Sequence, residues 1–322
     1  MTRNDVFRVL QEQPDLFVSG EDLARRLNIS RTAVWKAVRQ LKAEGFAIEA
    51  VTRRGYRLLS GSDVLTVEGI RRYLRHPEIL PQVFPVISST NTVLKAMAAE
   101  DAPAGTALVA AEQTAGRGRL GRSFYSPSGT GLYLSLLLRP DCTPAQAVRI
   151  TACAAVSAAE ALEELSGSPA GIKWVNDVYM DGKKVCGILT EAGLDLESSR
   201  MSYVVVGIGI NLHPPENGFP EEIRSVAGSA FGNRSVPDLR NRLAAAVLDK
   251  LADYTADPAS GLLYDAYKKR SFVLGKKISV LAPGKEPAAA EALDLNRDYS
   301  LQVRLENGET RSLRSGEISI RL

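Results

Sequence analysis

The spacing of apolar residues changes twice along this chain of 322 residues, and these changes constrain its fold more than any other feature. Through the first sixty residues apolar side chains recur every three or four positions, which is typical of helices that bury one face. The middle of the chain mixes helical spacing with strand-like runs. From Val273 onward, short runs alternate as they do in strands. The pattern predicts an α+β protein with three domains, at 1–62, 63–271 and 272–322.

The first domain is expected to contain three helices followed by a hairpin. Ser19 to Asp22 has the form of a capping box before the second helix, and Ser30 is placed to cap the third, which Gly45 is expected to end. Two short strands follow, Phe46–Val51 and Tyr56–Leu59, joined by a basic turn. This order of elements is typical of a winged helix-turn-helix domain.

Positive charge is concentrated in the same domain. The first sixty residues hold 11 basic and 7 acidic residues, whereas the rest of the chain holds 29 and 30. A basic helix face and a basic hairpin suit phosphates and base edges, so we expect DNA binding and, because one module covers a short half-site, a dimer. A helical protein-interaction domain with a solvated basic face is the alternative. The candidate DNA contacts are Ser30, Arg31, Thr32, Trp35, Lys36, Arg39, Arg53 and Arg54.

Other features exclude several classes of protein. The three cysteines and two histidines are far apart and show no metal-ligand spacing, so neither a structural zinc site nor a disulfide framework is expected. The N-terminus lacks the apolar run of a signal peptide, and no segment approaches the roughly 20 apolar residues that span a bilayer. We therefore expect a reduced, cytoplasmic protein.

The middle domain is expected to form a mixed sheet with helices against one face, because its strands and helices do not alternate regularly. A short linker, Ser60 to Asp63, is expected to precede it. The expected helices are Val67–Leu74, Asn91–Ala99 and Pro144–Leu165, with two more at Leu239–Tyr254 and Leu262–Ser271. The expected strands are Val83–Ile87, Thr106–Ala111, Leu132–Leu138, Gly171–Lys173, Val185–Thr190 and Tyr203–Leu212.

The segment Gly116 to Arg122 has the form G-x-G-x-x-G, but a dinucleotide-binding turn must open a helix, and here a Ser/Gly-rich stretch and a strand follow. The glycines permit close approach of a ligand, and Arg117, Arg119 and Arg122 can pair with phosphate or carboxylate oxygens. The segment is either a loop that closes over an anionic small molecule or a mobile basic surface loop.

Three later segments add candidate site residues. Lys173 to Asp177 places a cation, an aromatic ring and a carboxylate close together, and Asp181 to Leu189 has the form of a hairpin. The run Val206 to Asn211 has glycines at alternate positions on one face of a strand, so something is expected to lie against that face. A surface turn and a tight strand–strand contact are the alternatives.

Taken in order, Ser89-Thr90-Asn91, Gln113 with GRGRLGR, KWVND, GKKVCGIL and GIGIN resemble the motifs of biotin–protein ligases. With the DNA-binding domain in front, the chain resembles the bacterial enzymes of that family that also repress the biotin operon. The resemblance implies a class II synthetase-like catalytic domain and an SH3-like C-terminal β-barrel. The barrel is expected over Lys277–Leu281, Ala289–Leu295, Ser300–Leu305, Thr310–Arg314 and Ile318–Leu322, with a turn at Asn307-Gly308.

The resemblance also implies an activity: biotin and ATP form biotinyl-5′-AMP, and the biotinyl group passes to a lysine of the biotin carboxyl carrier protein of acetyl-CoA carboxylase. The partners implied are that carrier protein, operator DNA and a second copy of the chain. A biotin-sensing repressor without ligation, or a ligase for a related acid such as lipoate, remain alternatives. The C-terminal barrel is either a structural cap or a part of the ATP and acceptor site.

The matched motifs imply a role for each site residue. The resemblance assigns biotin to Ser89, Thr90, Asn91, Gln113, Arg117, Gly118, Arg119, Lys184, Gly207 and Gly209. It assigns ATP to Arg119, Lys173, Asn176 and Asn211, catalysis to Arg119, Lys184, Lys173 and Asp177, and Mg²⁺ to Asp177. The chain departs from the family at Ser88, where many relatives have Asp, and at Val175, where proline is common.

Overall fold

The computed structural model describes residues 2–13, 15–43, 46–59, 63–195, 200–281, 286–314 and 317–320, which divide into two compact units. One unit comprises Met1–Tyr73 with Arg234–Arg242, and the other comprises Leu74–Asn233 with Leu243–Leu322. Three sequence predictions concern positions outside the described residues: the helix end at Gly45, most of the linker (60–62) and the last two residues of the chain.

Side-chain caps define the helices of the N-terminal unit as the sequence predicts. Ser19 accepts a hydrogen bond from the Asp22 amide at 3.0 Å before α2, and Ser30 accepts one from the Ala33 amide at 3.1 Å at the start of α3. The helices are α1 (Thr2–Glu12), α2 (Gly20–Leu27), α3 (Arg31–Ala43) and α4 (Val67–Tyr73). The two strands are β1 (Ile48–Val51) and β2 (Gly55–Leu58), which pair antiparallel.

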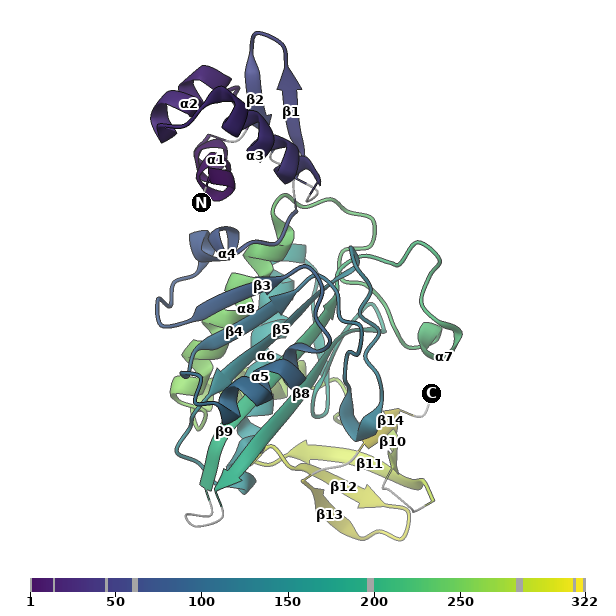
Figure 1. Cartoon of the computed structure of the whole chain (residues 1–322). Helices are drawn as coiled ribbons and strands as arrows, with labels where there is room; N and C mark the ends of the chain where they lie inside the picture. The colour runs from purple at the N-terminus through teal and green to yellow at the C-terminus, as the bar shows by residue number, and fades with distance from the viewer. Residues whose placement is uncertain are drawn as a thin grey trace. The chain divides into compact units, whose positions relative to one another are not determined.

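Helices α1 to α3 and the hairpin enclose one small apolar core. Its most buried members include Val6, Leu10, Leu23, Val34 and Leu41, each inaccessible to solvent. Gly55 opens β2 at φ +102°, where a Cβ atom would come within 2.2 Å of the Val18 carbonyl oxygen, so only glycine fits there. The helix-turn-helix and wing are therefore present (Figure 1).

A seven-stranded mixed sheet forms the centre of the second unit, in the order β3-β4-β5-β9-β8-β7-β6. Only β3 and β4 pair in parallel; the other neighbours are antiparallel. The strands are β3 (Leu80–Phe84), β4 (Thr106–Ala110), β5 (Gly131–Leu138), β6 (Gly171–Lys173), β7 (Asp177–Met180), β8 (Lys183–Asp195) and β9 (Arg200–Asn211).

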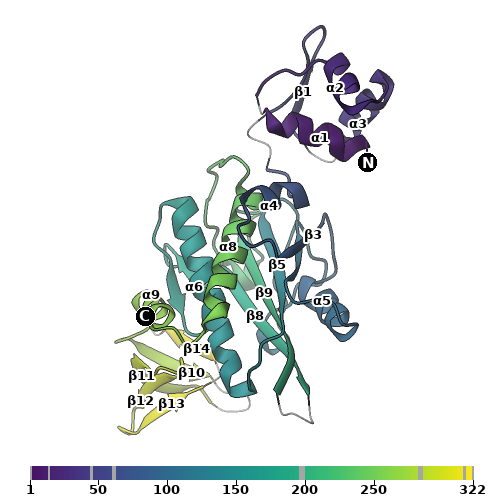
Figure 2. The same ribbon diagram turned by 90° about the vertical axis from the view of Figure 1, so that its left-hand side faces the viewer.

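Helices lie on both faces of this sheet, so the expectation of helices against one face was wrong. Helices α6 (Ala147–Ser166) and α8 (Leu239–Ala256) lie on one side of the strands, and α5 (Thr90–Ala99) lies on the other (Figures 1 and 2). Leu94 and Ala98 of α5 are fully or almost fully buried against the sheet. Because α5 covers only part of its face, the rest of that face is available for a pocket.

The expected strand Val83–Ile87 begins and ends earlier, at Leu80–Phe84. Proline is tolerated in an edge strand, where its missing N–H is not needed, so Pro81 lies inside β3 while Pro85 follows its end. The remaining helical segments are η1 (Arg119–Gly121), η2 (Pro144–Gln146), α7 (Glu221–Arg224) and α9 (Gly261–Arg270).

The C-terminal strands form an antiparallel sheet in the order β13-β12-β11-β10-β14. They are β10 (Lys277–Leu281), β11 (Ala288–Leu295), β12 (Leu301–Leu305), β13 (Thr310–Leu313) and β14 (Glu317–Ile320). Gly308, at φ +82°, forms the predicted turn between β12 and β13. Within the described residues no pairing joins β13 to β14, so the expected barrel is seen as an open sheet.

No helix in the described part of the chain is long and apolar enough to cross a membrane.

Candidate functional site

The exposed face of α3 presents the polar and cationic residues predicted to contact DNA. Arg31, Thr32, Trp35, Lys36 and Arg39 are all exposed, while the opposite face of the helix packs into the core. The Arg39 guanidinium lies 5.4 Å from the centre of the Trp35 ring, and that ring is 50% exposed. A large aromatic side chain exposed on a helix contributes little to folding, so this face is suited to binding.

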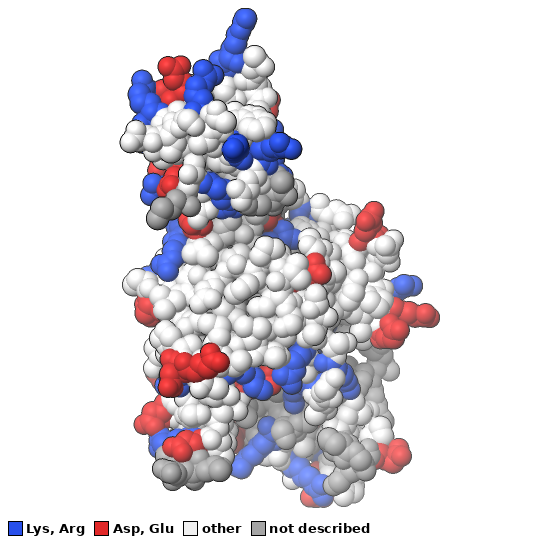
Figure 3. Space-filling model, viewed as in Figure 1, with Lys and Arg blue, Asp and Glu red and all other residues white. Residues whose placement is uncertain are grey.

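Arg53 and Arg54 are exposed on the wing, as predicted. Arg54 is stacked over the Phe17 ring at 4.2 Å, and Arg57 lies over the same ring at 4.7 Å. Basic side chains gather on the visible face of this unit (Figure 3). The unit thus combines an exposed helix with a cationic wing, the two parts needed to contact a groove and its phosphates.

A cavity of about 700 Å³ opens on the α5 side of the second unit's sheet, and all fourteen residues predicted to bind small molecules line it. In the space-filling view, basic side chains gather beside a hollow in this unit (Figure 3). The fourteen are Ser89, Thr90, Asn91, Gln113, Arg117, Gly118, Arg119, Lys173, Asn176, Asp177, Lys184, Gly207, Gly209 and Asn211.

The first turn of α5 forms a polar wall of this cavity. Ser89 caps the helix, and the Thr90 amide donates to the Gln113 side-chain oxygen at 2.9 Å. Ser135 of β5 lies 2.7 Å from the Thr90 hydroxyl and 2.6 Å from the Asn91 side-chain oxygen. Because these buried polar groups satisfy one another, they hold fixed hydrogen-bonding positions toward a ligand.

The two glycines of β9 make the floor, and side chains lie against both of them, as the alternating pattern predicts. A Cβ atom on Gly207 would lie 2.0 Å from the Asn91 side-chain oxygen, and one on Gly209 would lie 2.5 Å from the Phe124 ring. The missing side chains therefore admit Asn91 and Phe124 close to the sheet.

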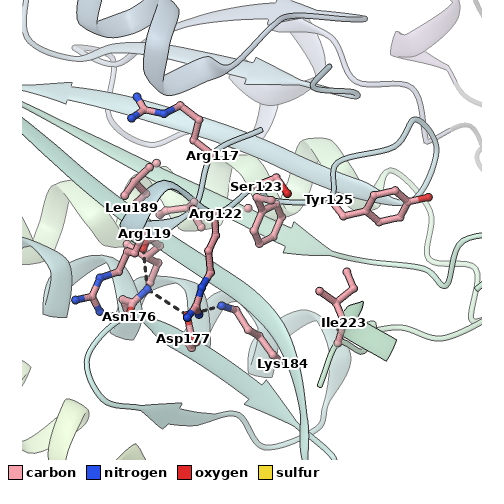
Figure 4. A pocket seen from close by; sticks show the side chains of 18 of the residues that line it. Arg117, Arg119, Arg122, Ser123, Tyr125, Asn176, Asp177, Lys184, Leu189 and Ile223 are labelled. Carbon is pink, nitrogen blue, oxygen red and sulfur yellow. Dashed lines mark hydrogen bonds and ion pairs between the residues drawn. The ribbon is translucent and has the colours of Figure 1, made fainter. Parts of the chain in front are cut away.

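Opposite charges meet at the other end of the cavity. Lys184 Nζ lies 2.7 Å from a carboxylate oxygen of Asp177, and Asn176 donates to the same oxygen at 3.1 Å. Arg119 donates to the side-chain oxygen of Asn176 at 2.7 Å, which joins the arginine-containing loop to the residue that precedes β7 (Figure 4). Two cations thus lie near one carboxylate, in side chains that remain partly accessible to solvent.

Lys173 and Asn211 also line the cavity, each held by a neighbouring group. Lys173 Nζ lies 5.9 Å from the centre of the Tyr179 ring, and burial together with the charge of Asp177 raises the pKa of Tyr179 to about 12. Asn211 donates to the Gly228 carbonyl oxygen at 3.1 Å, which ties β9 to the segment that follows α7. Tyr179 thus remains neutral at physiological pH beside Lys173.

Arg117 differs from the other predicted residues. Its side chain extends away from Asp177 and Lys184 (Figure 4) and pairs with Glu191, at 3.0 and 3.2 Å to the two carboxylate oxygens. Its neighbour Gly118 donates its amide to the Arg122 carbonyl oxygen at 2.7 Å. In this structure Arg117 therefore contacts a protein carboxylate at the rim of the cavity.

Several residues that line or support the cavity were not predicted. Ser126 supports Gln113 through a 3.0 Å hydrogen bond, and Glu191 joins α5 to the loop. The segment after β9 adds a further wall, because Lys184 and Ala227 form a bridge. The other unpredicted lining residues include Phe124, Tyr125, Leu189, Phe219, Glu222, Ile223, Val226, Leu281 and Ile318. The segment around residue 223 shows no regular spacing that could have indicated its position.

The arrangement can bind an anionic ligand together with a second anion. Lys184, Arg119 and Lys173 offset the repulsion between two negative groups, and uncharged hydrogen-bonding groups of the α5 turn line the other side of the cavity. No group of three His, Cys, Asp or Glu side chains that could hold a metal ion is found among the described residues. A divalent cation at Asp177 would therefore need most of its ligands from a substrate and from water.

Comparison with known proteins identifies relatives of both units. Residues 83–211 match the biotin/lipoate A/B protein ligase family, and residues 2–57 match a helix-turn-helix domain. The bifunctional ligase/repressor BirA of Bacillus subtilis is 40% identical over 230 residues, or 70% of each chain. The BirA of Salmonella typhimurium is 31% identical over 311 residues, or 95% of this chain and 93% of the relative.

A solved structure shares the fold of the second unit. The biotin protein ligase from Aquifex aeolicus, determined in complex with biotin and ATP, aligns with a TM-score of 0.61 at 30% identity. The alignment covers 75% of this chain and 98% of that one. The similarity thus extends over nearly the whole of the smaller protein.

Proposed function

Because the chain belongs to the biotin/lipoate A/B protein ligase family, among its bifunctional ligase/repressors, we propose that it joins biotin to a carrier protein and represses transcription. In the first step, a biotin carboxylate oxygen attacks the α-phosphorus of ATP. A C–O–P linkage forms, the bond to the β-phosphate oxygen breaks, and pyrophosphate leaves. In the second step, a neutral lysine amine of the carrier attacks the biotinyl carbonyl carbon and AMP leaves.

The observation that supports this function is the meeting of five separate motifs in one cavity. We assign biotin to the side with the α5 turn and Gln113, because that side carries uncharged hydrogen-bonding groups. We assign the nucleotide to the side with Arg119, Lys173, Asn176 and Asn211. Lys184 then lies where the carboxylate meets the α-phosphate.

Cations at that position speed the first step by stabilising charge that develops on the phosphate oxygens. Arg119 belongs to the glycine-containing loop, which excludes water from the mixed anhydride when it closes over the ligand. In the second step, we assign to Asp177 the uptake of the proton that the attacking amine loses. Its hydrogen bond with Asn176 holds the carboxylate toward the site.

The donor set at Asp177 suits Mg²⁺ that enters with ATP, because Mg²⁺ is commonly bound by one or two carboxylates together with substrate phosphates and water. When bound, the ion would neutralise phosphate charge. Asp177 is the carboxylate that we assign to it, and its contact with Lys184 would then be exchanged for the ion.

For the N-terminal unit we propose operator DNA as the ligand, bound by α3 and the wing. Exposed cations and Trp35 on one face of the unit support this proposal. One such unit covers a short half-site, so we also propose that two copies of the chain bind one operator, with dimer formation promoted by biotinyl-5′-AMP.

The ligase proposal is tested by incubating the full chain with MgATP, labelled biotin and a biotin carboxyl carrier domain. We expect label on the carrier lysine, and none when labelled lipoate replaces biotin. Label from lipoate would support the related-acid ligase instead. Adenylate formation without label on the carrier would support a biotin-sensing repressor.

A further inference from the structure

Glu191 is the one carboxylate that contacts both the arginine-containing loop and α5 in the described structure. Its side chain is only 15% exposed, and it pairs with Lys95 at 2.7 Å and with Arg117 at 3.0 Å. Asn91 also donates to it, at 3.1 Å. Glu191 therefore connects the first two turns of α5 to the beginning of the loop.

The charges around Glu191 outweigh the effect of its burial. Burial alone would raise the pKa of this carboxyl, but hydrogen bonds from Lys95 and Asn91 and the nearby charge of Arg117 lower it below its ordinary value. Glu191 is therefore ionised at neutral pH, as an ion pair with Arg117 requires.

Two arginines of the loop contact different parts of the unit. Arg117 pairs with Glu191 at one end, and Arg119 donates to Asn176 nearer the charged end of the cavity. Only the second attachment lies beside Asp177 and Lys184, because the Arg117 side chain extends in the other direction (Figure 4). The two arginines thus have different surroundings although they are two residues apart.

We propose that Glu191 is a positioning residue that fixes the resting position of the loop by holding Arg117. The Arg117 side chain is then an anchor, and only its backbone faces the ligand. The effect on ligand binding rests on the proposed function, since the loop is the segment that closes over biotin and its adenylate. The effect on the ligand-free loop does not depend on that function.

The ligand-free loop is tested by limited trypsin digestion of the full chain without biotin or ATP. Glu191→Gln keeps the shape of the side chain and one accepting oxygen but removes its charge. We expect cleavage after Arg119 and Arg122 to become about fivefold faster, because a partly exposed ion pair contributes about that factor to the closed population. Unchanged cleavage would overturn the proposal.

Glu164→Gln is the matched control for this digestion. Glu164 is an ion-paired glutamate of α6, with Lys250 Nζ at 3.3 Å, and it does not line the cavity. We expect this variant to be cleaved at the wild-type rate. Equal acceleration in both variants would show a general loss of stability and would contradict a specific role for Glu191.

A double-mutant cycle tests the anchor role of Arg117 in the working enzyme. We expect Glu191→Gln and Arg117→Met each to raise the KM for biotin about fivefold with kcat unchanged, and the double variant to show the same fivefold effect. Arg117→Lys is expected to restore most of the loss. A double variant weakened about 25-fold would mean that Arg117 acts on the ligand independently, and would overturn the proposal. If the wild-type chain makes no biotinyl adenylate, the proposed function fails, while the digestion still decides whether Glu191 anchors the loop.

Discussion

At the scale of single residues, the cavity depends on the absence of side chains at Gly207 and Gly209. Gly207 leaves room for the Asn91 side chain, whose oxygen lies 2.6 Å from the Ser135 hydroxyl and whose nitrogen donates to the Leu189 carbonyl oxygen at 3.0 Å. Because Asn91 is held from both ends, it cannot move aside for an added methyl group. The position of Asn91 in the polar wall of α5 therefore depends on glycine at position 207.

Gly207→Ala is expected to lower the free energy of unfolding of the second unit by about 2 kcal/mol, as overpacking of a close contact does. Trp174 is almost fully buried in this unit, and the only other tryptophan of the chain, Trp35, lies in the N-terminal unit. Urea unfolding followed by fluorescence in a Trp35→Phe background therefore measures the second unit.

Gly261→Ala is the control, because an added Cβ at that helical position meets no atom within 4 Å. We expect its stability to be unchanged or to rise by less than about 1 kcal/mol. If Gly207→Ala unfolded at the same urea concentration as this control, the close packing of Asn91 would not matter for stability.

At the scale of elements, the segment that enters β3 is attached to α8 by a cluster of charges. The buried Asp249 of α8 accepts the backbone amides of Arg75 and His76, at 3.0 and 3.2 Å. The His76 ring lies 2.9 Å from Asp253 and 2.7 Å from Glu78. These carboxylates, Asp253 first, raise the pKa of His76 above its ordinary value.

The stabilisation from His76 is expected to decrease as the pH rises. A raised folded-state pKa means that the folded protein holds the proton more tightly than the unfolded chain does. The stabilisation by protonated His76 is therefore complete at a pH below the unfolded-state pKa of about 6.5. It is lost as the pH rises through the folded-state pKa. Urea midpoints of the Trp35→Phe chain with and without His76→Gln, followed by Trp174 fluorescence from pH 5.5 to 8.5, should differ most at the acid end. A difference that stays constant over this range would contradict the role of the charged imidazole.

Elements with a regular apolar pattern could be predicted from the sequence, and irregular ones could not. The α3 helix has a repeating buried face and a capping serine, and β10 was placed at its observed bounds. The position of β3 depends on its place at the sheet edge, which decides whether Pro81 is allowed, and single-sequence patterns do not show an edge. The side of the sheet on which α5 lies is likewise a tertiary property.

The same distinction applies to the site. The glycines and arginines of the segment 116–122 indicate anion binding by themselves, whereas residues such as Ser89, Gln113 and Asn211 were predicted only through the resemblance to biotin–protein ligases. Glu191 could not, because its importance comes from Lys95 and Arg117, which are distant in sequence. The wall around Ile223 comes from a segment without periodicity, and sequence spacing gave no indication that it reaches Lys184.

At the scale of the whole molecule, two units with separate apolar cores support two separable activities. The core of the N-terminal helices and wing ends at Leu58, with Val64 packed beside it, and every residue that lines the cavity belongs to the other unit. Removal of residues 1–62 therefore leaves the lining of the cavity intact.

A chain that begins at Asp63 is expected to form biotinyl adenylate and to lose sequence-specific DNA binding. Adenylate formation from labelled ATP and electrophoretic mobility shifts on DNA selected by the full chain measure the two properties. Specific binding of that DNA by the shortened chain would contradict the assignment of α3 and the wing to operator recognition.

We propose that cations around Lys184 bring two mutually repelling anions together so that an acyl phosphate forms. The most direct measurement is the rate of biotin-dependent adenylate formation from ATP labelled at the α-phosphate, in the wild type and in Lys184→Met. We predict a rate about a hundredfold lower in the variant, the usual scale for loss of one charge-stabilising donor. The matched control is Lys183→Met. Lys183 donates to the Ser225 carbonyl oxygen and does not line the cavity. This variant should retain the wild-type rate. Adenylate formed by folded Lys184→Met at the wild-type rate would contradict the account.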